Sequence, residues 1–328
     1  MPNLILQSPE LSADLVSQRV RVMVEDKPVK DVPLFDIESV VISTSCKVSM
    51  HLLSALLQRS IPVSFVDWSG ELVGSLILPT SHGRLRFSQF QSLQNRPLCL
   101  AIAALIVEAK IMNSRRIIQR LGNYVESREV TILGSLKNLA NAAKGANSIE
   151  ELMGFEGLAA AKYFETYSSF YPKDVPFEKR SRRPPLNAPN SVLSYCYAIL
   201  YSEAVTSLAA SGLDPSLGYL HIPEDGRFSL ALDMIEPFRA VVADSLAIDA
   251  FSHGILCPVR HFENRNGGVY LSVEGKKKFF VQYEKRMERE FNSPDGSRTT
   301  LRRELGKQCT KIKQVIYDNA IFEPFFLL

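Results

Sequence analysis

One histidine and two carboxylates in the second half of the chain have the types and spacing of a cation-binding group. His221 ends an apolar turn, and Asp233 and Glu236 follow it after the Gly/Asp turn at 224–226. Residues three apart lie on one face of a helix, so Asp233 and Glu236 are predicted to point the same way. Burying unpaired charge in so apolar a run is costly, and a cation would supply the partner. Taken alone, however, a lone histidine after a turn is more often a structural residue than a ligand, and a DxxE pair is usually a solvated helix face.

A further carboxylate lies on the apolar face of a predicted helix nearer the N-terminus. Ser148 and Glu151 form a capping box at the start of this helix. Glu156 falls on its apolar stripe, where a carboxylate needs either a core arginine or a metal ion as counter-charge. Gly154 and Gly157 would let a backbone or a substrate approach closely. The stripe consists of Ile149, Leu152, Met153, Ala160, Tyr163, Phe164 and Tyr167.

Length and composition indicate a globular protein with two domains. The chain has 328 residues, of which 46% are hydrophobic and 22% charged. A formal net charge of +3 argues against wholesale coating of nucleic acid and leaves only local basic patches for such contact. Five scattered cysteines without a CxxC pair argue against a zinc site or a disulfide framework and fit a reducing cytoplasm. No signal peptide or membrane-spanning run is evident, so a cytoplasmic protein is expected.

The first 78 residues are predicted to form a small β-rich domain with one covering helix. Alternation of polar and apolar residues is typical of half-buried strands, and leucines at helical spacing indicate a helix at 49–59. Nothing in this domain has the pattern of a catalytic residue. The predicted extended runs are 19–24, 32–42, 61–66 and 72–78.

Residues 79–94 are rich in Pro, Gly and Ser and are predicted to be a linker. Arg84 within it would contact phosphate, unless the segment is a solvated hinge.

From residue 95 to 328 the periodicity is helical. Asn95 is expected to cap the first helix, with Pro97 in its first turn. Asn190 is expected to cap a later helix, and Ser229 the helix that carries Asp233 and Glu236. Pro237 would then kink that helix and free the carbonyl of Asp233. The predicted helices are 95–121, 130–143, 149–167, 191–210, 229–238, 276–291 and 297–316, and the apolar tail at 322–328 is expected to dock on a core.

A proline-rich loop at 171–190 carries a cluster of cations. Arginine is well matched to phosphate, so this loop is a candidate for DNA binding, although a charge run is also typical of a solvated surface. The last two predicted helices carry a second basic surface. The candidate DNA-binding residues of the loop are Lys179, Arg180, Arg182 and Arg183.

Three ordered segments have a joint pattern, namely MGFEGLAAAKYF, RRPPLNAPNSVLSYCYAILYSEA and GLDPSLGYLHIPEDGRFSLALDMIEPFR. Together they resemble the CRISPR-associated Cas1 family. The resemblance implies an α+β fold, in which a small N-terminal β-rich domain precedes a larger all-helical catalytic domain. It also implies a metal-dependent DNA endonuclease and integrase of antiviral defence. Such an enzyme inserts short foreign DNA pieces into a CRISPR array by 3′-hydroxyl attack on repeat phosphodiesters.

The resemblance places catalytic and metal-binding roles on Glu156, His221 and Glu236, with Asp233 as an additional acid nearby. The family has Asp in some members where this chain has Glu236, so the choice between Asp233 and Glu236 as direct ligand stays open. Oxygen and imidazole donors suit Mg²⁺ or Mn²⁺. The implied partners are a second copy of the chain through the β domain, a small Cas2 protein, and double-stranded DNA of the prespacer and the CRISPR repeat.

Two other functions fit the same residues. A structure-selective DNA nuclease that never integrates would share the metal site. A non-catalytic DNA-binding scaffold would use only the basic loop, and the joint presence of Glu156, His221 and Glu236 argues against it. No protein nucleophile is evident, because His253 and His261 flank Cys257 without the pattern of a triad.

Overall fold

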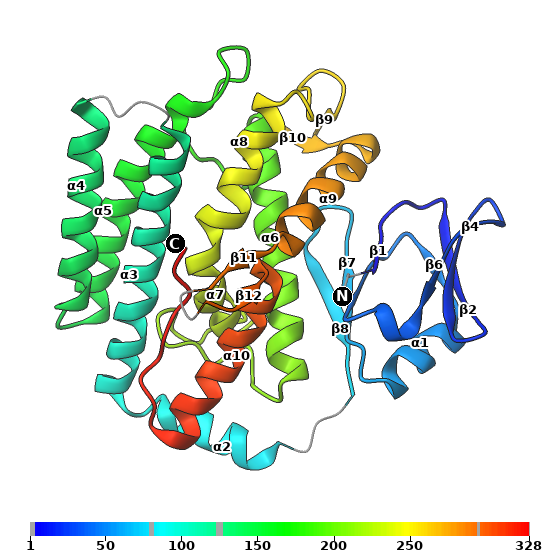
Figure 1. Cartoon of the computed structure of the whole chain (residues 1–328), viewed down its shortest axis with the longest axis horizontal. Helices are drawn as coiled ribbons and strands as arrows, with labels where there is room; N and C mark the ends of the chain where they lie inside the picture. Colours follow the sequence, from blue (N-terminus) through cyan, green and yellow to red (C-terminus); the bar gives the residue numbers. More distant parts are fainter. Residues whose placement is uncertain (1–3, 79–81, 123–126, 294–295, 328) are drawn as a thin grey trace.

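The computed structural model of the chain describes residues 4–78, 82–122, 127–293 and 296–327. A strand-rich region lies at one end of the molecule and a larger helical region at the other (Figure 1). The α+β class and the order of its two parts are therefore confirmed. The helical part also contains two short antiparallel hairpins, so it is not helical throughout.

The N-terminal region consists of two four-stranded sheets with one helix. Its helix α1 (Met50–Gln58) begins at Ser49, whose side chain accepts a hydrogen bond from the Leu52 amide, and it buries Leu52 and Leu56. The extended run predicted at 32–42 is divided by a short 3₁₀ turn. The first sheet has the order β1 (Leu4–Leu6), β5 (Val40–Ser43), β7 (Val63–Val66), β8 (Leu72–Leu76). The second has the order β4 (Lys27–Pro33), β3 (Arg19–Val24), β2 (Leu11–Val16), β6 (Lys47–Val48).

The predicted linker at 79–94 is wrong for most of its length, because it contains the helix α2 (Gly83–Ser92). Leu85 and Gln89 of this helix are buried. The amide of Gln89 exchanges two hydrogen bonds of 2.9 Å with the backbone of Asp214. Because a buried polar side chain is satisfied here by the helical domain, α2 belongs to that domain rather than to a hinge.

The helical domain is built around α3 and α6, with the other helices packed against them (Figure 1). Both helices are long and apolar enough to cross a membrane by length and composition, yet half or more of each such window is buried inside the protein, as in a core helix. The helices are α3 (Arg96–Leu121), α4 (Ser127–Lys144), α5 (Ile149–Tyr167), α6 (Ala188–Ala210), α7 (Ser229–Ile235), α8 (Ser245–Ser252), α9 (Val273–Glu288) and α10 (Leu301–Asp318). Shorter elements are the 3₁₀ turns η1 (Leu34–Asp36), η2 (Ser168–Phe170) and η3 (Glu236–Phe238), the π-helical η4 (Ala240–Asp244), and the hairpins β9 (Phe262–Arg265) with β10 (Gly268–Leu271) and β11 (Phe291–Asn292) with β12 (Arg298–Thr299).

Side-chain capping follows the prediction at α3 and differs from it at α5 and α6. Asn95 caps α3 as predicted. At α5, Ser148 accepts from the Glu151 amide, but the Glu151 carboxylate accepts from Asn147 instead of returning the bond to Ser148. The cap of α6 is Asn187, and Asn190 is a buried residue of its first turn.

The β domain meets the helical domain along α6. Thr206 Oγ1 lies 2.6 Å from Ser64 Oγ and 3.1 Å from Ser75 Oγ across this boundary. At the β7–β8 turn, Gly70 has a φ of +85°, and a Cβ there would lie 2.8 Å from a ring carbon of Tyr195. The turn needs glycine both for its left-handed backbone and for this close approach.

The C-terminal tail docks on the core, as predicted. Phe322 and Phe325 are buried, and the side chain of Asn113 in α3 donates to the Phe325 carbonyl and accepts from the Leu327 amide. The tail thus satisfies a buried amide in the middle of α3.

Candidate active site

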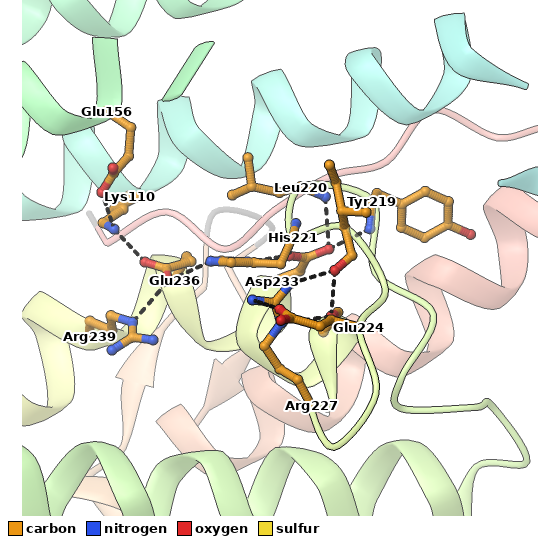
Figure 2. A network of polar contacts seen from close by, with 12 residues as sticks. Lys110, Glu156, Tyr219, Leu220, His221, Glu224, Arg227, Asp233, Glu236 and Arg239 are labelled. Atoms are coloured by element: carbon orange, nitrogen blue, oxygen red, sulfur yellow. Dashed lines mark hydrogen bonds and ion pairs between the residues drawn. The ribbon is translucent and has the colours of Figure 1, made fainter. Parts of the chain in front are cut away.

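Side chains from distant segments meet in a pocket of about 430 Å³ in the helical domain. Glu156 comes from α5, His221 from the loop between α6 and α7, and Glu236 from the first position of η3. Lys110 of α3 and Arg239 after η3 complete the group (Figure 2). The structure therefore brings together the three residues predicted to act as one site.

Glu236 is a deeply buried carboxylate of this pocket, with 5% of its side chain exposed. Its Oε1 lies 3.1 Å from Nε of Arg239, and its Oε2 lies 2.5 Å from Nζ of Lys110. Burial by itself would raise the pKa of this carboxyl, but the charges of Arg239 and Lys110 outweigh it and lower the pKa to about 2. Glu236 is therefore an anion at every physiological pH.

Lys110 bridges the two carboxylates of the pocket. Its Nζ donates to Oε1 of Glu156 at 2.5 Å while it also lies against Glu236. Burial opposes its charge, but the two carboxylates raise the pKa of the ammonium above its ordinary value. A lysine from another helix therefore supplies the counter-charge of Glu156, and sequence reasoning missed it. The sequence signal that could have revealed it is the single basic residue, Lys110, in the mostly apolar run LIVEAKIM.

Asp233 does not face the pocket. It is fully buried, and its Oδ2 accepts from the backbone amides of Tyr219 and Leu220 at 2.6 and 3.0 Å. Its Oδ1 accepts from the amide of His221 at 3.0 Å and lies 2.7 Å from Nδ1 of the same residue (Figure 2). Both oxygens are thus used inside the protein. The contact fixes the imidazole with Nε2 directed towards Glu236, 4.0 Å from Oε1.

The helix that carries both acids ends earlier than the sequence indicates. α7 stops at Ile235, and the chain continues as a 3₁₀ turn from Glu236, because Pro237 cannot extend an α-helix. The predicted free carbonyl of Asp233 is absent, since the Glu236 amide donates to it. Ser229 is not a side-chain cap either, and its hydroxyl donates to the Ile222 carbonyl.

A second buried acid, missed in the sequence, borders the pocket. Asp244 accepts hydrogen bonds from the hydroxyl groups of Tyr163 and Tyr197, at 2.8 and 2.5 Å. Burial raises its pKa to about 6, although the two tyrosines, Arg180 and Arg239 act in the opposite direction. Asp244 ends a π-helical turn, an irregularity that is frequent at functional sites.

The basic loop divides into one structural arginine and several exposed cations. Arg180 is half-buried, donates to the side chains of Asn190 and Ser194, and lies over the Tyr197 ring. Lys179, Arg182 and Arg183 are exposed. Arg180 and Arg182 line the pocket, and Arg183 pairs with Glu71 of the β domain. Arg84 is exposed at the start of α2 and does not line the pocket.

Two carboxylates and an imidazole are the donor set of a hard divalent cation such as Mg²⁺ or Mn²⁺. In the part of the chain that the structure describes, no three acidic, histidine or cysteine side chains stand close enough together to hold an ion as they are. Lys110 occupies the space between Glu156 and Glu236. Oε2 of Glu236 is buried and, among the described residues, receives no aligned hydrogen bond. Its neighbour is the Lys110 ammonium at 2.5 Å, which is also 2.5 Å from Oε1 of Glu156. Both carboxylates thus already face a cation between them, so the residues fit the ion.

Comparison with known proteins identifies relatives along nearly the whole chain. The sequence pattern of the family "CRISPR associated protein Cas1" matches residues 4–285. The "CRISPR-associated endonuclease Cas1 1" of Thermus thermophilus is 30% identical over 304 residues, or 92% of each chain. A "CRISPR-associated exonuclease Cas4/endonuclease Cas1 fusion" of Geobacter sulfurreducens is 36% identical over 253 residues, which is 74% of this chain. The chain spans about half the length of such fusions.

Solved structures agree with this result. A CAS1 protein from Thermotoga maritima superposes with a TM-score of 0.81 at 25% identity, covering 98% of this chain and 99% of that one. A chain of a "Cas6-RT-Cas1--Cas2 complex" superposes with a TM-score of 0.80 at 26% identity, covering 99% of this chain and 36% of that one.

The raised pKa of Asp244 predicts a pH dependence of stability. Between the ordinary value of 3.8 and about 6, the folded state holds a proton that the unfolded state releases. The free energy of unfolding therefore falls as pH rises through this window, by about 3 kcal/mol. Asp244→Asn keeps the shape of the side chain but cannot titrate. The free energy of unfolding of this variant minus that of wild type should therefore rise by about 3 kcal/mol between pH 4 and 7. Urea unfolding of both metal-free proteins measures the difference, and a difference that does not change with pH would contradict the assignment.

Proposed function

The chain belongs to the Cas1 family, and from this premise we propose that it is a metal-dependent DNA endonuclease and integrase of CRISPR spacer acquisition. It inserts short foreign DNA pieces into a CRISPR array by 3′-hydroxyl attack on repeat phosphodiesters, with water as the attacking group in simple cutting. The observation that carries the proposal is the convergence of Glu156, His221 and Glu236 from three separate segments on one pocket.

The residues proposed to hold Mg²⁺ or Mn²⁺ are Glu156, His221 and Glu236. Asp233 is proposed to position His221 instead of binding the ion, because its two oxygens already accept backbone and imidazole hydrogens. When bound, the ion would polarise the phosphate and stabilise the attacking and leaving oxygens. By holding Nδ1, Asp233 leaves Nε2 of His221 as the free ring nitrogen on the pocket side.

The cations of the pocket have a role that does not depend on the ion. Phosphoryl transfer places negative charge on the phosphate oxygens, and cationic groups held in advance stabilise it. Arg239 is kept in place by Glu236 at 3.1 Å and by the face of the Tyr197 ring, 4.8 Å from its guanidinium carbon. Arg182 lines the same pocket and is available to a DNA phosphate. Arg227 lines it as well, but its guanidinium is held by Glu224 and by the Ile222 carbonyl.

A second cavity of about 810 Å³ continues from the pocket towards the β domain. Several residues line both cavities, among them Arg182, Arg227 and Arg239. Basic grooves with interleaved aromatic rings suit single-stranded nucleic acid, since cations hold the phosphates and rings stack on unpaired bases. The aromatic residues of this cavity are Trp68, Tyr195, Tyr197, Tyr201 and Tyr270.

The proposed partners are double-stranded DNA of the prespacer and the repeat, a small Cas2 protein, and a second copy of the chain. The similarity to the Cas1 part of a Cas1–Cas2 complex supports the Cas2 assignment. Large apolar side chains exposed on the β domain support self-association there. They are Val29, Phe35, Met50, Val73 and Leu78. A cytoplasmic location follows from the same proposal.

Glu156→Gln should reduce both cutting and strand transfer by about 100-fold or more, because a neutral amide holds a divalent ion more weakly than a carboxylate does. The assay combines the purified protein, its Cas2 partner and Mn²⁺ with a short duplex and a supercoiled plasmid that bears a repeat. Glu165→Gln, an exposed residue of the same helix, is the control. Near-normal activity of Glu156→Gln would refute the metal site, and cutting without strand transfer by the wild type would favour the non-integrating nuclease.

The exposed cations of the basic loop should determine the salt dependence of DNA binding. Replacing Lys179, Arg182 and Arg183 with Ala should weaken binding to unrelated sequences about equally and make the slope of log affinity against log salt shallower by about 2 to 3. Arg180 is left intact because it is part of the fold. The matched control replaces Lys27, Lys30 and Lys47, which are exposed on the β domain. An unchanged slope would indicate that DNA binds the basic surface of α9 and α10 instead of the loop. If activity is also retained without Glu156, the result would favour a non-catalytic DNA-binding scaffold.

The β domain is expected to form the dimer. Phe35 and Met50 are 72% and 75% exposed, and introducing Glu at both places two charges in the proposed apolar interface. Light scattering of this double variant should give the monomer mass of 36.7 kDa, against twice that mass for the wild type. Val259→Glu, at a residue of the helical domain that is 89% exposed, should stay dimeric. A double variant that remains dimeric would place the interface elsewhere.

A further inference from the structure

The position of Lys110 has a consequence for how the site takes up its cation. Nζ of Lys110 lies 2.5 Å from Oε1 of Glu156 and 2.5 Å from Oε2 of Glu236. These carboxylates come from α5 and η3, and Lys110 reaches them from α3 (Figure 2). The ammonium thus stands where an ion shared by the two carboxylates would stand.

A lysine ammonium and a divalent cation cannot occupy this place together. Mg²⁺ binds carboxylate oxygens at about 2.0–2.1 Å, and an ion that bridges Glu156 and Glu236 at such distances would overlap the space of Nζ. Like charges so close together in a buried site repel strongly. Lysine ends a flexible four-carbon stem, and its side chain is still 21% exposed at the pocket, so it has room to withdraw.

The charges in the pocket explain what this exchange achieves. Lys110 and Arg239 balance Glu156 and Glu236 in the structure. Exchange of the ammonium for a divalent ion leaves the lysine charge nearby and adds two positive charges. A DNA phosphodiester returns negative charge to the pocket and offers its oxygens to the displaced ammonium.

We propose that Lys110 is a built-in competitor of the catalytic cation. It keeps the metal-free site neutral and folded, and it is displaced to the DNA phosphate when the ion binds. This inference rests on the proposed function, since it takes Glu156 and Glu236 as ligands. By linkage, DNA and the ion should each strengthen the binding of the other.

The alternative is that Lys110 only positions the carboxylates, and the two roles predict opposite signs. Removing a competitor tightens metal binding, whereas removing a positioning residue weakens it. Removing Lys110 also leaves the buried Glu236 and the partly buried Glu156 without this partner, so the metal-free protein should lose stability and regain it with the ion.

The test is a Mn²⁺ titration of the DNA-free, full-length protein, followed by the spin resonance signal of free Mn²⁺. Lys110→Met, which keeps the length of the side chain without its charge, should bind Mn²⁺ about tenfold more tightly than wild type. Its thermal midpoint should be lower in EDTA and rise more on adding Mn²⁺. Lys110→Arg keeps the charge and should bind Mn²⁺ no more tightly than wild type. If Lys110→Met does not fold, Lys110→Gln takes its place.

Lys144→Met is the matched control, because Lys144 makes a similar pair with Glu108 at 2.7 Å outside the pocket. Its Mn²⁺ affinity should equal that of wild type. Affinity of Lys110→Met equal to or weaker than wild type, with binding that still depends on Glu156, would overturn the competitor role alone. Binding that does not change in Glu156→Gln would instead overturn the metal site on which the proposed function rests.

Discussion

The cost of burying the carboxylate of Glu236 governs the arrangement of the site. An isolated carboxylate with so little access to water would take up a proton or destabilise the fold. Two cations hold it ionised, Lys110 from α3 and Arg239 from the segment after η3. Because these partners come from different elements, charge compensation also fixes α3 against η3. Lys110 extends the same constraint to α5 through Glu156.

A single buried acid organises the loop that presents the histidine. Three backbone amides at 219–221 converge on Asp233, which thereby replaces the water that these groups would otherwise bind. The same carboxylate holds the imidazole of His221. The two acids of α7 and η3 therefore have separate tasks: Asp233 shapes the loop from inside, and Glu236 faces the pocket (Figure 2).

Tyrosines connect this arrangement to the neighbouring helices. Tyr163 of α5 and Tyr197 of α6 both donate to Asp244, and the ring of Tyr197 lies beneath Arg239. The helix that carries Glu156 is thus tied to the cation that compensates Glu236. Tyr167 adds a bond from α5 to the backbone carbonyl of Asp244. A change in one of these groups therefore affects both sides of the pocket.

The sequence by itself determined the fold class, most helices and the three residues that meet in the pocket. Local signals carried this information: alternation in β3, the cap at Asn95, and the motifs around Glu156, His221 and Glu236. Only the tertiary structure decided which groups compensate the buried charges, because Lys110 lies 46 residues from Glu156 and 126 from Glu236 along the chain. The tertiary structure also separated the roles of Asp233 and Glu236, which were predicted to share one helix face. The α-helix ends at Ile235 before Pro237, and Glu236 begins a 3₁₀ turn. The helix α2 was not predicted for a related reason. Its buried face includes a polar residue, Gln89, and the partner of that residue, Asp214, lies 125 residues away along the chain.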